Sequence, residues 1–476
     1  MAGYTPICEI PKIYHGLKET FGTGLTKPVS WRRCQLLQLA RFVKENADAM
    51  ADAVALDLGK PKQEFMMTEV SASIERSLIA ADQVAEWAKP EAVTPAKEWQ
   101  KGWNPRIEKH PKGVVLIIAP WNYPMVLNLQ PLIGAISAGC CALLKPSEIA
   151  PHFSSFLAHN LGNYLDPNAY RVALGGVPET TRILEFKWDH IFYTGNSRVG
   201  RIIASAAAKH LTPTTLELGS KSPVIVDSTA DIQLSARRIL WGKVTNAGQI
   251  CVAPDYILAE RSILPALLDA LKEEYRSFYP EGPFKSSSYG RIVSDAHVER
   301  LKGVLGRTNG QIVLGGKWSE DQGKRGLEPT FVVDVKPGDS LLEEELFGPI
   351  LPIVAVESLD EAIGYVNARN HPLVVYIFSS DEGNKRKIID NTVSGSVAVN
   401  DVFFQLAVNE LPFGGVGESG YGRQVLKYSF DNFVYLRSIT DTPYADEPNF
   451  QARYPPYTKE SYDLFAAILQ TPIPEE

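Results

Sequence analysis

The sequence is poor in cysteine, and its cysteines show no pattern of pairing. The five are Cys8, Cys34, Cys140, Cys141 and Cys251. This odd and scattered set contains no CxxC pair and no histidine spacing typical of zinc ligands. We therefore expect neither a disulfide framework nor a metal site.

The sequence also lacks a long apolar run and a surplus of basic residues. The run "GVVLIIAP" has the length of a strand, whereas a membrane helix needs about 20 residues. The start, "MAGYTPICEI", has no basic segment and no apolar core, so we expect a cytoplasmic location, with membrane association only if a C-terminal anchor was removed. A formal net charge of -7 argues against nucleic acid. Small molecules and further copies of the chain are the expected partners.

The pattern that is present is typical of an α/β protein. A length of 476 residues indicates two or three domains. Apolar residues recur at helical spacing from about residue 31 to 90, interrupted at Gly59 and Pro61. Short apolar runs then alternate with helical stretches, first in "GVVLIIA", "CALLK", "RVALGGV" and "HIFYTG", and later in "SPVIVD", "DYILAE", "IVLGG", "PTFVVDV", "ILPIVAV" and "PLVVYIFS". This alternation predicts two open parallel sheets.

Polar residues follow three strands of the first predicted sheet. They lie in 120–124 ("PWNYP"), in 145–148 ("KPSE") and in 194–200 ("TGNSRVG"). Ligands bind beyond the carboxyl ends of such strands, so these segments are expected to converge on one site. The turn through Gly195, Asn196 and Gly200 opens a helix and suits a phosphate. An ordinary strand-to-helix turn is the alternative.

Two charged side chains at the second strand end suit a ribose. Lys145 and Glu148 together offer an ammonium and a carboxylate to the hydroxyls of an adenosine ribose. Their alternative interpretation is a solvated charge pair. A carboxylate here favours NAD, since it would repel the 2′-phosphate of NADP, although Lys145 and Arg198 soften that repulsion.

One cysteine stands in a small polar turn, "NAGQIC", where neither a core nor a disulfide requires it. Cys251 is therefore a candidate nucleophile. Glu217, between Leu216 and Leu218, is expensive to bury as an ion, and the resulting rise in pKa suits a general base. The alternative is a structural Glu217 paired with Lys221 or Lys243. Cys140 and Cys141 are expected to be small buried side chains rather than a redox pair.

Seven motifs in order resemble those of the aldehyde dehydrogenase superfamily. They are "APWNYP", "KPSE", "FYTGNSRVG", "LELGSKSP", "NAGQICVAPDY", "EELFGP" and "LPFGGVGESGYG". "CVAPDY" and the later "RYPPY" further resemble the class 3 or fatty aldehyde branch. The resemblance implies a Rossmann-type dinucleotide-binding domain in residues 1–87 and 110–220 and a catalytic domain in 221–404. It also implies a small bridging or oligomerisation element with a C-terminal tail, in 88–109 and 405–476.

The resemblance implies NAD(P)-dependent oxidation of an aldehyde to the carboxylic acid. Cys251 attacks the aldehyde to form a thiohemiacetal, Asn122 and the N–H of Cys251 hold the oxyanion, and the thioester left after hydride transfer is hydrolysed by water that Glu217 activates. Glu345 matches the family residue that binds the nicotinamide ribose, and Phe347 the residue that packs near the nicotinamide. Structural roles for Glu345 and Phe347 are the alternative. NAD is the expected cofactor, with NADP as a second possibility.

The expected substrate is an apolar aldehyde, long-chain or aromatic, because apolar and aromatic side chains flank these motifs. The candidate pocket residues are Trp121, Tyr123, Ile250, Val252, Phe403 and Phe404. A homodimer is expected, with the C-terminal tail shaping the substrate entrance. Two residues depart from the family pattern: Ser220, where a second glycine is usual and a stiffer turn is expected, and Gln405, where class 3 relatives tend to have histidine.

Two other functions compete with this interpretation. A cysteine hydrolase or acyltransferase would use Cys251 and a base without a cofactor, but it would have no need of Lys145, Glu148 or the turn at 195–200. A non-catalytic binding protein of the same fold would be expected to lose Cys251, Glu217 or Asn122, and all three are present.

Overall fold

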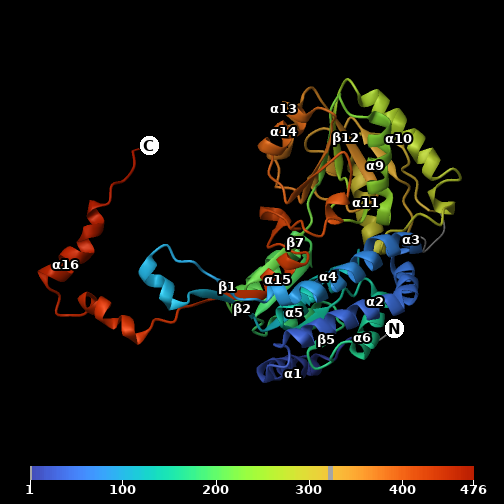
Figure 1. The fold of residues 1–476 in the computed structure, drawn as a ribbon. Helices are drawn as coiled ribbons and strands as arrows, with labels where there is room; N and C mark the ends of the chain where they lie inside the picture. Colours follow the sequence, from blue (N-terminus) through green and yellow to red (C-terminus); the bar gives the residue numbers. More distant parts are fainter. Residues whose placement is uncertain (1–2, 320–324, 476) are drawn as a thin grey trace. The chain divides into compact units, whose positions relative to one another are not determined.

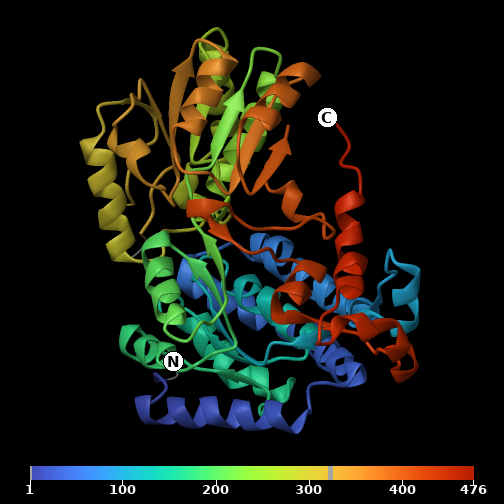
Figure 2. The same ribbon diagram turned by 90° about the vertical axis from the view of Figure 1, so that its left-hand side faces the viewer.

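A computed structural model describes residues 3–319 and 325–475 and divides the chain into two units. The larger unit contains the chain up to Trp87 and Pro111–Val434. The smaller unit contains Ala88–His110 and the chain from Tyr435 onward. In Figures 1 and 2 the larger unit has two halves: the N-terminal helices, in blue, lie in the half that contains the first sheet, and the yellow and orange part of the chain forms the other half.

The chain opens with helices, as the apolar periodicity predicts. They are α1 (Ile10–Thr23), α2 (Val29–Leu58), the short α3 (Lys62–Phe65) and α4 (Ser71–Trp87). Gly59 ends α2 in the left-handed region, at φ 61°, where glycine carries no steric penalty. A single π-helical turn, Met66–Val70, joins α3 to α4, so the segment between α2 and α4 is compact and irregular.

The first sheet has six strands in the order β15-β7-β6-β3-β4-β5. The strands are β3 (Val114–Ile118), β4 (Cys141–Lys145), β5 (Tyr170–Val172), β6 (His190–Gly195), β7 (Thr214–Leu218) and β15 (Gly420–Tyr421). All pairs are parallel except β15 with β7. The connecting helices are α5 (Val126–Ala138), α6 (Pro151–Asn160), α7 (Val177–Leu184) and α8 (Ser197–Ala208).

The chain leaves β3 for β4 on one side and later returns to β6 on the other side. Ile118, at the end of β3, is therefore in register with both Lys145 and Tyr193. This is the switch point of a doubly wound sheet, where ligands bind. The predicted convergence of three strand ends is confirmed.

The second sheet has seven strands in the order β10-β11-β12-β9-β8-β13-β14. They are β8 (Pro223–Val226), β9 (Tyr256–Glu260), β10 (Gln311–Leu314), β11 (Thr330–Val333), β12 (Ile350–Val356), β13 (Val374–Phe378) and β14 (Ser396–Val399). The helices of this part include α9 (Ile232–Val244), α10 (Leu264–Phe278), α11 (Asp295–Arg307), α13 (Leu359–Asn367) and α14 (Glu382–Asn391). Strand β10 runs antiparallel to β11, so the sheet is mixed rather than wholly parallel.

The smaller unit is built on a three-stranded sheet of β1 (Glu91–Ala92), β2 (Arg106–Pro111) and β16 (Val434–Ile439). Its C-terminal part contains α16 (Lys459–Ala466). Residues 405–434, which the sequence analysis grouped with this element, pack in the larger unit instead. The reason is α15 (Lys427–Phe433), which buries Phe430 and Phe433 and lies against α5.

Within the described ranges, no helix combines the length and the apolar composition that crossing a membrane requires. In the same ranges no cluster of three histidine, cysteine or acidic side chains is arranged to hold a metal ion.

Candidate active site

Cys251 follows a left-handed turn at the end of α9. The turn Thr245–Gly248 contains Asn246 at φ 50°, Ala247 at φ 52° and Gly248 at φ 73°. A side chain at Gly248 would also meet the carbonyl oxygen of Gly348 at 2.3 Å, so only glycine fits there. The sharp turn leaves Cys251 partly exposed between two buried residues, Ile250 and Val252.

Gln249 holds this turn together from inside. Its side-chain amide donates to the carbonyl oxygens of Asn246 at 2.9 Å and Arg291 at 3.0 Å. Its side-chain oxygen accepts from Val293 N–H at 2.9 Å. Gln249 is fully buried, so these hydrogen bonds are shielded from water and fix the backbone just before the thiol.

Asn122 reaches the same turn from the first sheet. It follows β3, is 3% exposed, and its Nδ2 donates to the carbonyl oxygen of Gln249 at 3.1 Å. A side-chain amide has two N–H groups. One N–H of Asn122 binds the turn that leads to Cys251, residues 245–250, here named the nucleophile turn. The second N–H is the one that the predicted role of Asn122 assigns to a substrate oxygen. The fold thus brings two predicted catalytic residues, distant in the chain, to one place.

Glu217 is a buried carboxylate at the end of β7, where its strand position pairs with Thr194 and Gly420. Neither carboxylate oxygen accepts a hydrogen bond from the described residues. Burial raises the pKa of Glu217 well above its usual value, and the opposing effects of Arg423 and Gln424 are smaller. The alternative pairing with Lys221 does not occur, because Lys221 forms its ion pair with Asp255.

Lys243, the other proposed partner of Glu217, lies 4.0 Å from Asp255 instead. Burial lowers the pKa of Lys243 to about 8. Glu217 therefore has the free oxygens and the raised pKa expected of a general base.

Two acidic side chains share the surroundings of the thiol. Burial raises the pKa of Cys251 to about 12, and the carboxylates of Glu345 and Glu217 add to the rise. The backbone N–H groups of Cys251 and Val252 act in the opposite sense, so they lie close enough to interact with the sulfur. Without a nearby positive charge, the thiol is protonated at neutral pH.

Glu345 lies against the turn after β7. Its Oε2 would be 2.0 Å from a Cβ at Gly219, so a larger residue there would displace the Glu345 carboxylate. Burial raises the pKa of Glu345, and the N–H of Ser220 and the charge of Lys221 oppose the rise. The hydroxyl of Ser220, which replaces the usual glycine, accepts from Leu373 N–H at 2.7 Å and ties the turn to the start of β13.

Lys145 and Glu148 lie at the end of β4, as predicted. Lys145 Nζ is 2.7 Å from Glu148 Oε2, and Lys145 is only 5% exposed, so this is not a solvated surface pair. A cavity of about 320 Å³ opens beside it, lined in part by Pro146, Glu148 and Gly175. The site at this strand end has room for a polar ligand.

The turn between β6 and α8 presents the start of a twelve-residue helix. Asn196 caps it by accepting from Val199 N–H at 2.9 Å, so its side chain has a structural role. Gly200 allows close packing, since a Cβ there would lie 2.9 Å from Leu218. At Gly195 a Cβ would meet the Tyr193 hydroxyl at 2.2 Å. The helix N-terminus remains suited to a phosphate.

The candidate pocket residues do not form one group. The Trp121 ring contacts Phe347, at 5.3 Å between ring centroids, and so lies on the predicted nicotinamide side. Tyr123, Ile250 and Val252 are buried, and Val252 accepts a hydrogen bond from the Tyr376 hydroxyl. Phe403 contacts Trp241, whereas Phe404 is 61% exposed.

Gln405, the second departure from the family pattern, has both polar side-chain atoms shielded from solvent and lies near Tyr376. The Gln405 amide therefore lies near the tyrosine whose hydroxyl donates to the carbonyl oxygen of Val252, next to Cys251.

Sequence reasoning missed three residues that bear on this site: Lys60, Glu64 and Glu69. They lie between α2 and α4, in the compact segment described above. Lys60 and Glu69 are fully buried, and Glu64 accepts from Asn246 N–H at 2.9 Å. The letters "KPKQEFMMTE" carry no catalytic motif, so only the sequence's break in helical spacing marked the segment.

Two open sheets, polar residues at the switch point of the first sheet, and a partly exposed thiol near a buried carboxylate are the arrangement expected of a cofactor-linked enzyme. A model of the aldehyde dehydrogenase family matches residues 12–439. The chain belongs to the aldehyde dehydrogenase family.

Relatives of known name agree with this assignment. The chain is 44% identical to "Aldehyde dehydrogenase, dimeric NADP-preferring" of Rattus norvegicus, over 92% of this chain and 96% of that protein. It is also 44% identical to "Aldehyde dehydrogenase family 3 member B2" of Mus musculus, over 93% and 91% of the two chains. The class 3 branch predicted from "CVAPDY" and "RYPPY" is therefore confirmed.

Solved structures show the same fold. The substrate-bound AldH of Staphylococcus aureus is 40% identical, with a TM-score of 0.92 over 97% of this chain and 99% of that chain. An NAD-dependent aldehyde dehydrogenase of Sinorhizobium meliloti is 26% identical, with a TM-score of 0.85 over 93% and 89%. The predicted α/β class with two sheets is confirmed.

The raised pKa of Cys251 generates a first prediction. In the cofactor-free protein, the rate of alkylation of Cys251 by iodoacetamide should rise about tenfold per pH unit from pH 7 to pH 10, because the thiolate fraction grows by that factor below the pKa. Mass spectrometry of the Cys251 peptide measures the rate, and Cys251→Ser identifies that peptide. A plateau near pH 8 would show that the thiol is ionised without cofactor.

Proposed function

We propose that this protein oxidises an aldehyde to the carboxylic acid with Cys251 as nucleophile and NAD(P) as hydride acceptor. The observation that carries the proposal is the meeting of three groups. The partly exposed thiol of Cys251, the amide of Asn122 and the unpaired carboxylate of Glu217 lie on turns that the fold joins. A thiol, an oxyanion donor and a base are the groups that acyl transfer through a thioester requires.

Asn122 and the backbone at Cys251 stabilise the oxyanion. When the thiolate adds to the carbonyl carbon, the negative charge develops on the substrate oxygen. The second N–H of Asn122 Nδ2 and the backbone N–H of Cys251 donate to that oxygen. Both donors are fixed before substrate arrives, so they need little reorganisation as the charge develops.

Glu217 activates the water that hydrolyses the thioester. Both of its oxygens are free of other donors, so either accepts a proton from water. Burial raises its pKa above the usual value, which makes the carboxylate a stronger base.

The cofactor residues fit a dinucleotide. Glu148 and Lys145 would bind the adenosine ribose, the N-terminus of α8 the phosphates, and Glu345 the nicotinamide ribose, with Phe347 packed nearby. A nicotinamide bound there supplies the acceptor for the hydride that aldehyde oxidation releases. The cavity beside Glu148 and the buried Glu345 both favour this function over a hydrolase without cofactor.

Roles for the domains follow from membership of the aldehyde dehydrogenase family. Residues 1–87 and 110–220 would bind the dinucleotide, 221–404 would supply the catalytic turn, and 88–109 with the C-terminal tail would mediate assembly. We propose a cytoplasmic homodimer. The free thiols and the word "dimeric" in the name of the Rattus norvegicus relative support this proposal.

Separating the two half-reactions tests the role of Glu217. Glu217→Gln should reduce one equivalent of cofactor per active site in a burst and then slow by a factor of about 10² to 10⁴ in steady state, the usual contribution of a general base. Rapid-mixing absorbance of the reduced cofactor measures both phases. Cys251→Ser is the control and should lose the burst and the turnover together. Normal steady-state turnover in Glu217→Gln would assign the base elsewhere.

Glu148 generates a prediction on cofactor choice. NAD should have a higher kcat/KM than NADP in the unmodified protein, and Glu148→Gln should raise the NADP to NAD ratio about tenfold, because it removes a carboxylate that repels the 2′-phosphate. Glu185→Gln, an exposed acid at the end of α7, is the matched control. A tenfold preference for NADP before mutation would contradict the assignment.

The apolar side chains near the thiol generate a prediction on substrate. Across straight-chain aldehydes from two to ten carbons, kcat/KM should rise by up to about fourfold per methylene, the equivalent of about 0.8 kcal/mol of buried CH₂. Initial rates of cofactor reduction measure the series. A flat series would exclude an apolar pocket.

Deleting residues 457–476 tests whether the tail shapes the substrate entrance, since the deletion should change the ratio of kcat/KM for long aldehydes to kcat/KM for short ones.

A further inference from the structure

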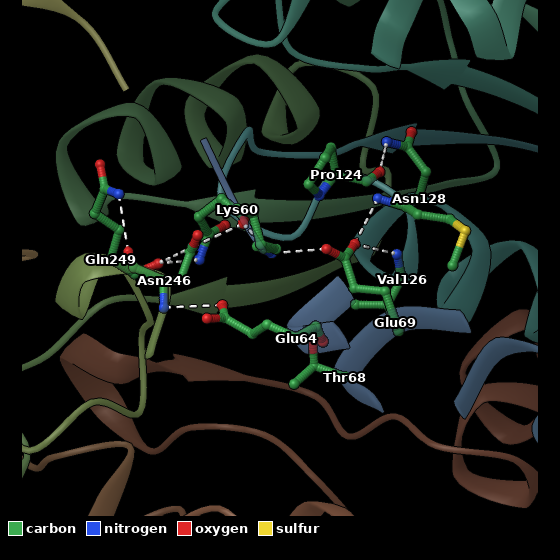
Figure 3. Close-up of polar contacts among 11 residues, drawn as sticks. Lys60, Glu64, Thr68, Glu69, Pro124, Val126, Asn128, Asn246 and Gln249 are labelled. Atoms are coloured by element: carbon green, nitrogen blue, oxygen red, sulfur yellow. Dashed lines mark hydrogen bonds and ion pairs between the residues drawn. The ribbon is translucent and has the colours of Figure 1, made fainter. Parts of the chain in front are cut away.

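The segment from Lys60 to Glu69, here named the clamp segment, lies against both turns of the active site (Figure 3). It contains α3 and the single π-helical turn Met66–Val70. Nothing in the reaction described above uses its charged side chains. Among the described residues, the side chains of Lys60, Glu64 and Glu69 form their hydrogen bonds and ion pairs with each other or with the backbone of the two turns.

Lys60 and Glu69 form a fully buried ion pair, with Lys60 Nζ 2.7 Å from Glu69 Oε1. Lys60 Nζ also donates to the carbonyl oxygen of Asn122 at 3.1 Å and lies 3.6 Å from the centroid of the Tyr123 ring. A buried ion pair is costly to desolvate and is therefore weak evidence for stability alone. Its contact with the Asn122 backbone points to a different role.

Glu69 holds the other end of the same turn. Its Oε2 accepts from the N–H groups of Met125 at 2.9 Å and Val126 at 3.2 Å, at the start of α5. That helix has no side-chain cap of its own, so Glu69 replaces one from outside the helix. The turn after β3, residues 120–126, contains Asn122 and is here named the oxyanion turn. The Lys60–Glu69 pair therefore fixes this turn at the carbonyl of residue 122 and at the amides of residues 125 and 126.

Glu64 performs the matching task on the nucleophile turn. Its Oε1 accepts from Asn246 N–H at 2.9 Å, as Figure 3 shows. Asn246 is the first of the three left-handed residues before Cys251, and its Nδ2 donates to the carbonyl oxygens of Asn122 at 2.9 Å and Gln249 at 3.1 Å. Asparagine tolerates the left-handed conformation better than most residues, but the Ala247 that follows it does not, so the turn persists only where its surroundings hold it.

We propose that Lys60 and Glu64 are positioning residues for the reaction: they hold the oxyanion turn and the nucleophile turn in register, so that the Asn122 amide and the Cys251 thiol address one carbonyl group. The carbonyl oxygen of Asn122 is the shared point, because both Lys60 Nζ and Asn246 Nδ2 donate to it. This inference rests on the roles proposed above for Cys251 and Asn122. It adds that the register of the two turns is set from a third element.

The charge of Glu64 sets the conditions for a test. Burial raises the pKa of Glu64 to about 7; Lys60 and the N–H of Asn246 oppose that rise, whereas Glu69 adds to it. Tyr123 and Tyr279 also face this carboxylate, and the charge raises the pKa of each of them. Glu64 is predominantly ionised at pH 8, and the experiments belong there.

Two substitutions at residue 64 separate the hydrogen bond from the charge. Glu64→Met removes the acceptor while keeping the length of the side chain, and kcat should fall about tenfold or more, because small displacements of reacting groups cost large factors in rate. KM for aldehyde and cofactor should stay within about threefold. Glu64→Gln keeps an oxygen that accepts from Asn246 N–H, so it should retain at least a third of kcat. Gln63→Met, an exposed neighbour on α3, is the matched control and should retain full activity.

A second pair of variants tests Lys60. Lys60→Met alone leaves Glu69 buried without its partner and is expected to destabilise the fold. The double variant Lys60→Met with Glu69→Gln removes both charges and retains an acceptor for the start of α5. It should fold, bind NAD within about threefold of the unmodified affinity, and lose about tenfold in kcat. Rates are expressed per active site counted by titration with NAD, so a loss of folded protein does not imitate a loss of rate.

The outcomes distinguish this proposal from the proposed function. A tenfold loss of kcat in Glu64→Met that Glu64→Gln restores supports positioning. Equal rates in Glu64→Met and Gln63→Met, or a double variant with unchanged kcat, would overturn it. If Cys251→Ser retained turnover, the proposed function itself would fail, whatever the result at residues 60 and 64.

Discussion

The active site depends on a backbone turn that the chain would not adopt by itself. Asn246, Ala247 and Gly248 lie in the left-handed region in succession, and the first two carry a side chain that makes this conformation unfavourable. Three contacts stabilise this unfavourable backbone conformation. Gln249 fills the interior of the turn, Glu64 accepts a hydrogen bond from the N–H of Asn246, and Gly248 lies against the carbonyl of Gly348. As a result, the thiol of Cys251 lies close to Asn122, which follows a strand of the first sheet.

The electrostatics around the thiol have a consequence for its control. Burial and the nearby carboxylates of Glu345 and Glu217 raise the pKa of Cys251, so its proton is held tightly. Burial likewise raises the pKa of Glu217, and neither of its oxygens accepts a hydrogen bond from the described residues. A positive charge close to the thiol would lower its pKa and raise its reactivity toward electrophiles. A nicotinamide ring carries such a charge in its oxidised form, which would couple thiol reactivity to cofactor binding.

Much of the framework could be predicted from local patterns. The apolar runs marked β3 to β6 and β8 to β13, and Gly59 marked the end of α2. The antiparallel direction of β10 was not predicted, because "IVLGG" reads the same in either direction and only its pairing with β11 settles the matter. Residues 405–434 were grouped with the wrong unit for a related reason: Phe430 and Phe433 of α15 find their partners on α5, far away in the chain.

The sequence by itself determined that Cys251 stands in a tight turn, that Glu217 lies between apolar neighbours and that strand ends carry Asn122, Lys145 and Glu148. These are local facts, because residue type and spacing express them directly. Only the tertiary structure decided that Asn122 donates to the turn of Cys251, that neither Glu217 oxygen accepts a hydrogen bond from the described residues, and that Lys60 and Glu64 contact the two turns. Those facts depend on which side chains are buried against one another when the chain folds. Burial of that kind arises from contacts between distant segments and leaves no periodic trace in the chain.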